Sequence, residues 1–68
     1  MLTKQAARKI LMNEAQVYKQ MGCSSELFES SLKDADPILN KDSLEVQAYD
    51  LIHDELVHII ALVWKPMR

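Results

Sequence analysis

The sequence predicts an all-α fold, in which one domain over residues 1–68 contains three helices in the order long, short, long. Three observations support this prediction. Apolar residues recur at helical spacing in the first and last thirds of the chain. One Gly and two Pro are too few for the turns of a many-stranded sheet. A hydrophobic content of 49% is too high for a disordered segment.

The first predicted helix runs from about residue 4 to residue 21. Thr3 can serve as its N-cap, and Gly22 can end it in the left-handed conformation that follows many helices. One face of this helix is apolar and contains Ala6, Ala7, Ile10, Leu11, Val17, Tyr18 and Met21. Glu14 lies in the middle of that face, where an unpaired carboxylate is costly to bury.

The second predicted helix is short and begins after a cap at Ser24 or Ser25. It must end before Pro37, because proline disfavours helical geometry in the residue before it. In the loop over residues 36–41, we expect Ile38 and Leu39 to fill part of the core. The third helix then begins after Asp42, which forms a capping-box pattern with the residue three positions later.

The third predicted helix spans residues 44–64 and is the most apolar part of the chain. Its apolar arc covers more than twice the roughly 100° that one buried face requires. We therefore expect it to be buried on two sides. One side packs antiparallel to the first helix, with the second helix across an end, and the other side binds a second copy in a dimeric bundle. The residues predicted to bind this partner are Val46, His53, Val57, Ile60 and Trp64.

The main functional prediction is a small non-enzymatic module for protein interaction or regulation, which forms a homodimer or binds another protein and needs no cofactor. At this length only about 60% of the unfolded surface can be buried, so association would add stability. His53 is one of the residues predicted to bind the second copy. Association should therefore weaken near pH 5 to 6, where histidine gains a charge. A polar stripe of Gln47, Asp50, Asp54 and His58 faces away from the apolar arc.

A second interpretation rests on Glu14, Glu55 and His58. Glu55 and His58 form a Glu-x-x-His pair on one helical face, and Glu14 lies on another helix. This set resembles half of the ligands in ferritin-like carboxylate proteins, which bind two iron or manganese ions. The resemblance implies a two-metal site assembled across a homodimer. His53 and His58, five residues apart, lie too far around a helix to bind one ion together.

A third interpretation rests on residues 19–32. An apolar residue followed by Gly22, and a Ser that opens the next helix, resemble the turn and recognition helix of bacterial helix-turn-helix repressors. The resemblance implies a DNA-binding regulator. The net charge of −2, together with Glu26 and Glu29 on the second helix, makes nucleic acid the less favoured partner.

The cellular setting is predicted from cysteine usage and hydropathy. Cys23 is the sole cysteine, so no disulfide can form within the chain, and a reducing cytoplasm is expected. No uncharged run reaches 18 residues, so no transmembrane helix is predicted.

Overall fold

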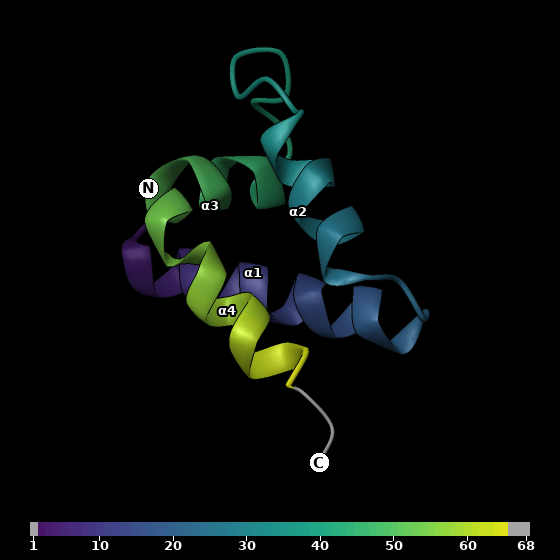
Figure 1. Ribbon diagram of the computed structural model, residues 1–68. Coiled ribbons are helices and arrows are strands. Elements are labelled where there is room, and N and C mark those ends of the chain that lie inside the picture. The colour runs from purple at the N-terminus through teal and green to yellow at the C-terminus, as the bar shows by residue number, and fades with distance from the viewer. Residues whose placement is uncertain (1, 66–68) are drawn as a thin grey trace.

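The computed structural model describes residues 2–65, and this part of the chain is helical without any strand. Its elements are α1 (Lys4–Gln20), α2 (Ser25–Lys33), α3 (Leu44–Ile52), the 3₁₀ turn η1 (His53–Glu55) and α4 (Leu56–Val63) (Figure 1). The predicted all-α class is confirmed. The segment predicted to form one third helix is helical over residues 44–63, but η1 divides it in two.

The starts of α1 and α2 and the end of α1 have the capping residues that the sequence predicts. The Thr3 hydroxyl accepts a hydrogen bond from the Ala6 N–H at 3.1 Å, and the Ser24 hydroxyl accepts one from the Leu27 N–H at 3.1 Å. Gly22 has φ +81°, a conformation that a residue with a side chain rarely adopts. The two N-caps and the glycine stop after α1 are therefore confirmed.

The predicted cap of the third helix is wrong by one residue. Ser43, not Asp42, is the N-cap of α3, and its hydroxyl accepts a hydrogen bond from the Val46 N–H at 3.4 Å. The same hydroxyl donates to the Glu45 carboxylate at 3.1 Å. The Ser43 N–H donates to the Asn40 carbonyl at 2.9 Å. This bond closes the preceding turn, so the chain becomes extended at Ser43.

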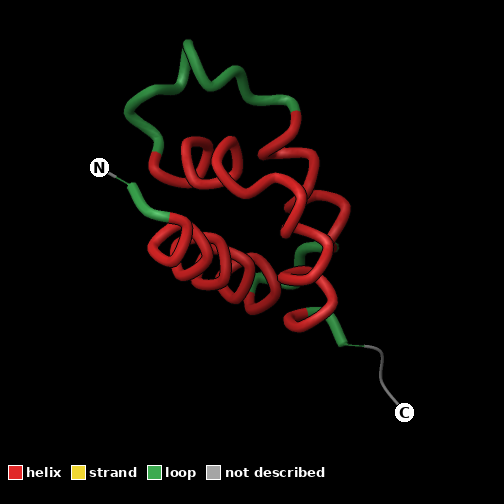
Figure 2. The backbone as a smooth tube through the Cα atoms, turned by 90° about the vertical axis from the view of Figure 1, so that its left-hand side faces the viewer, coloured by secondary structure: helices red, strands yellow, loops and turns green. Residues whose placement is uncertain are grey.

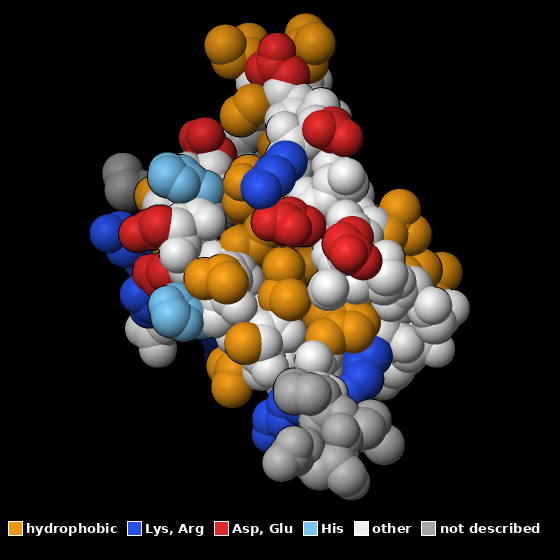
Figure 3. Space-filling model, viewed as in Figure 1, with side chains coloured by type: hydrophobic (Ala, Val, Ile, Leu, Met, Phe, Trp, Pro, Cys, Tyr) orange, Lys and Arg blue, Asp and Glu red, His pale blue; other side chains and the backbone are white. Residues whose placement is uncertain are grey.

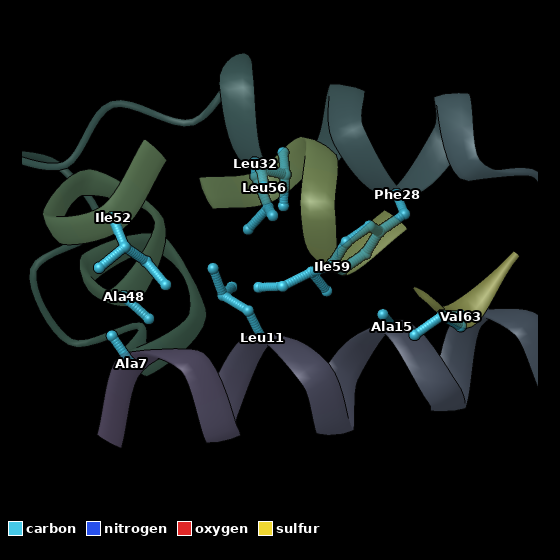
Figure 4. Close-up of a cluster of buried hydrophobic side chains, with 10 residues drawn as sticks. All are labelled: Ala7, Leu11, Ala15, Phe28, Leu32, Ala48, Ile52, Leu56, Ile59 and Val63. Atoms are coloured by element: carbon cyan, nitrogen blue, oxygen red, sulfur yellow. The ribbon is translucent and has the colours of Figure 1, made fainter. Parts of the chain in front are cut away.

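The chain reverses direction between α3 and α4. Glu45, at the start of α3, lies beside Glu14, and Ile52, at its end, lies near Ala7 (Figure 4). From η1 through α4 the chain runs the other way along α1. Glu55 pairs with Arg8 near the start of α1, and the Val63 carbonyl accepts a hydrogen bond from Lys19 near its end. The reversal occurs at Ile52, whose φ of −129° and ψ of 38° are not helical.

A straight continuation of α3 would leave the core uncovered. By Ile52 the helix has reached the first turns of α1, and twelve further residues would extend about 18 Å past that end. The fold-back instead returns α4 along α1, where Leu56, Ile59 and Val63 become buried.

The core lies between α1 and the other helices (Figure 4). Phe28 and Leu11 are among the largest fully buried side chains, and the Tyr18 ring meets Phe28 edge-on at 5.2 Å. The molecule is small and elongated, with extents of 39 × 22 × 18 Å. The buried cluster consists of Ala7, Leu11, Ala15, Phe28, Leu32, Ala48, Ile52, Leu56, Ile59 and Val63.

The loop between α2 and α3 does not fill the core. Ile38 and Leu39 are each 81% exposed, so the prediction that they are buried is wrong. Leu32 and Val46, which precede and follow the loop, are the buried residues on either side of it. The loop projects away from the helices (Figure 2), and the Gln47 side chain holds it there by hydrogen bonds to two of its carbonyls.

No helix among the described residues is long and apolar enough to cross a bilayer.

Candidate functional site

The outer side of α4 has an uncharged stripe of four residues, here called the α4 face: Val57, Ile60, Ala61 and Trp64. Their spacing of three, four and seven residues places them on one side of a helix. Val57 is 65% exposed, Ala61 is exposed, and Ile60 and Trp64 are half-buried against the core. Figure 3 shows apolar side chains gathered over α4 and the neighbouring edge of α2.

The C-terminal end of the α4 face is fixed to the rest of the fold. The Trp64 ring lies 5.5 Å from the Phe28 ring, and its indole N–H donates to the Cys23 carbonyl at 3.2 Å. Lys19 Nζ donates to the Val63 carbonyl at 2.8 Å. The indole is thus held by packing and by a hydrogen bond, while part of it remains open to solvent.

The predicted partner-binding residues are only partly brought together. Val57, Ile60 and Trp64 share the α4 face, but Val46 belongs to α3 and is buried with 7% exposure. His53 lies on η1, where it is exposed and its ring meets Tyr49 at 6.3 Å. The reversal at η1 is the physical reason, because the prediction assumed one continuous helix from residue 44 to residue 64.

Glu55 is held by a cation from α1. Arg8 Nε lies 2.5 Å from Glu55 Oε1, and Arg8 Nη2 donates to Glu55 Oε2 at 3.2 Å. The hydrogen bond from Arg8 lowers the pKa of the Glu55 carboxyl below its ordinary value, and the same bond raises the pKa of Arg8. The pair is solvent-exposed, so water and salt screen it and it contributes little to stability.

Glu14 faces another carboxylate. It shares a recess of about 230 Å³ with Glu45 and with Tyr18, Ser31 and Ser43. Desolvation and the negative charge of Glu45 raise the pKa of Glu14, so its protonated form is favoured. The pKa of Glu45 is lowered, first by a hydrogen bond from its own backbone N–H and then by Ser43.

The residues of the two-metal interpretation lie in separate places. Glu14 faces the start of α3, whereas Glu55 is bound by Arg8. His58 is an exposed residue of α4, and its proximity helps to lower the pKa of Glu55. Within residues 2–65, no three His, Cys, Asp or Glu side chains lie close enough to hold a metal ion.

The segment that resembles a helix-turn-helix joins α1, a tight turn at Gly22 and α2. The α1 helix has 17 residues, and the outer side of α2 presents Glu26 and Glu29. Glu29 forms an ion pair with Lys33 at 3.0 Å. Phosphate groups would therefore meet negative charge on the helix that would have to read the DNA.

Comparison with known proteins gives no relative, since no family model, curated protein or solved structure matches the chain.

Sequence reasoning missed three residues that shape these surfaces. Ala61 completes the α4 face, and its helical spacing from Val57 was a usable signal. Arg8 and Glu45 act through contacts with distant parts of the chain. Such contacts depend on how the helices dock, which the spacing of apolar residues does not determine.

Proposed function

We propose that this chain is a small non-enzymatic protein-interaction module that binds a second copy of itself through the α4 face. The observation that carries the proposal is the exposed, uncharged stripe at helical spacing, with Val57 at 65% exposure. In small domains, burial of such a stripe between subunits is a common source of added stability.

The spacing of the α4 face is self-complementary. In a two-fold contact the same patch meets itself in reverse order. With the axis between Ile60 and Ala61, Val57 of one copy lies opposite Trp64 of the other, and each Ile60 lies opposite the small Ala61 side chain. Trp64 then meets the smaller Val57, and Ile60 meets the small Ala61, so the side chains of the two helices can interdigitate.

The contact is expected to be weak and dependent on concentration. The α4 helix has eight residues and is about 12 Å long, so it presents less than the roughly 800 Å² per partner of a standard interface. A dissociation constant on the order of micromolar or higher follows. Such a dimer would respond to protein concentration and to a competing partner for the same face.

The test compares two matched variants by sedimentation equilibrium. Val57→Asp places a charge in the α4 face, and Leu62→Asp places one on the same helix about 140° away, at a comparable 57% exposure. Both sites are exposed, so both variants should fold, which circular dichroism checks. We expect Val57→Asp to raise the dissociation constant at least tenfold and Leu62→Asp to leave it within about twofold. Equal effects, or a wild-type protein that stays monomeric at millimolar concentration, would refute the proposal.

A further inference from the structure

The loop between α2 and α3 presents two adjacent apolar side chains, Ile38 and Leu39, here called the loop tip. Each is 81% exposed, which is the highest exposure among the large hydrophobic residues in the described part of the chain. The loop that contains them extends from one end of the molecule (Figures 1 and 2). The proposed α4 contact leaves this tip uncovered.

Hydrogen bonds hold the loop tip in place. Asp36 Oδ1 accepts from the Ile38 N–H at 2.9 Å, and the Asp36 carbonyl accepts from the Asn40 N–H at 2.9 Å. The Gln47 amide donates to the Pro37 carbonyl at 2.9 Å and to the Asn40 carbonyl at 3.3 Å. An apolar tip on a fixed turn loses little conformational freedom when it binds, which favours association.

The loop tip is surrounded by negative charge. Asp34, Asp36 and Asp42 are exposed on the same loop, where Lys41 is the opposing cation. Figure 3 shows carboxylates beside the apolar side chains at the top of the molecule. A surface that receives the tip should therefore combine an apolar floor with a positively charged rim.

The N-terminal half of α1 has this combination. Its outer side has a shallow hollow of about 690 Å³, here called the α1 hollow, lined by Arg8, Lys9, Ile10, Met12, Asn13 and Gln16. Lys4 adds a further cation, and the first turn of α1 has no acidic residue. The charge of Arg8 is already balanced by Glu55 of the same chain, so Lys9 and Lys4 supply the positive charge open to a partner.

We infer that the loop tip of one copy docks in the α1 hollow of another copy, with its aspartates beside Lys9. The loop and α1 lie on opposite sides of α3 (Figures 1 and 2), so this contact joins different surfaces of the two copies. A contact of that kind is head-to-tail and does not close after two subunits. Association through it continues beyond the dimer and is separate from the α4 contact.

The direct test is photo-crosslinking from the tip. A benzophenone amino acid replaces Leu39, and this protein is mixed with an excess of ¹⁵N-labelled wild type before irradiation. Mass spectrometry is expected to find cross-links from position 39 to labelled peptides within residues 8–16. Cross-links confined to one chain, to α4, or absent at millimolar concentration would overturn the inference.

Variants separate this contact from the α4 contact. In the Val57→Asp background, Leu39→Asp and Lys9→Glu should each weaken the remaining association at least tenfold. Leu27→Asp, at a 52% exposed site on α2, is the matched control and should leave it unchanged. If Lys9→Glu instead reduces only the retention of duplex DNA, the hollow binds nucleic acid and the inference fails. Loss of all association with Val57→Asp alone would also refute it, while supporting the α4 dimer.

Discussion

At the scale of single residues, Glu14 and Glu45 form an unfavourable contact between like charges. Two carboxylates lie together in a recess between α1 and the start of α3, and desolvation raises the pKa of Glu14. A raised carboxyl pKa means that protonation stabilises the fold. That contribution is complete below the unfolded-state pKa and is lost as the pH rises through the folded-state value. At neutral pH the ionised Glu14 therefore opposes folding.

Replacement of Glu14 by Gln should stabilise the protein. Gln keeps the shape of the protonated acid and removes the repulsion from Glu45. We expect the free energy of unfolding at pH 7, measured by urea denaturation, to rise by up to about 1 kcal/mol. The gain should shrink near pH 4, where the wild-type Glu14 is itself protonated. A Glu14→Gln variant that is less stable than wild type at pH 7 would contradict this account.

At the scale of secondary structure, the start of α3 depends on one hydroxyl. Ser43 caps the helix, while Asp42 belongs to the preceding turn. Ser43→Ala should lower the free energy of unfolding by about 1 kcal/mol, because the Val46 N–H loses its acceptor. Asp42→Ala is the matched control and should change it by less than about 0.5 kcal/mol. Thermal denaturation of both variants decides between the two caps. A larger loss of stability in Asp42→Ala than in Ser43→Ala would identify Asp42 as the cap.

Local signals in the sequence predicted the cap at Thr3, a cap at Ser24 or Ser25, and the stop at Gly22, because these depend on neighbouring residues alone. The reversal at residues 53–55 could not be predicted in the same way. Neither Gly nor Pro marks it, and the residues His53, Asp54 and Glu55 are compatible with a helix. The break exists because Leu56 and its successors can cover α1 only if the chain turns back, which is a consequence of tertiary packing.

At the scale of the whole molecule, exposed apolar residues include those of the α4 face and of the loop tip. The α4 face was partly predictable, since Val57, Ile60 and Trp64 have helical spacing, but the same reasoning placed the buried Val46 beside them. The loop tip was predicted to be core, because an apolar pair in a short loop usually packs inward. The loop is held in this exposed position by the hydrogen bonds of Asp36 and by those of Gln47, which depend on the folded arrangement of α3.

The most direct test of the proposed dimer is an isotope-filtered NOE experiment on a mixture of ¹³C-labelled and unlabelled protein. Within one chain Val57 and Trp64 are seven residues apart along α4, or about 10 Å, which is too far for an NOE. The antiparallel two-fold contact brings the Val57 methyl groups of one copy to the Trp64 ring of the other. We therefore predict intermolecular NOEs between these groups at millimolar concentration. Their absence in a sample that sediments as a dimer, or a sample that remains monomeric, would contradict the account.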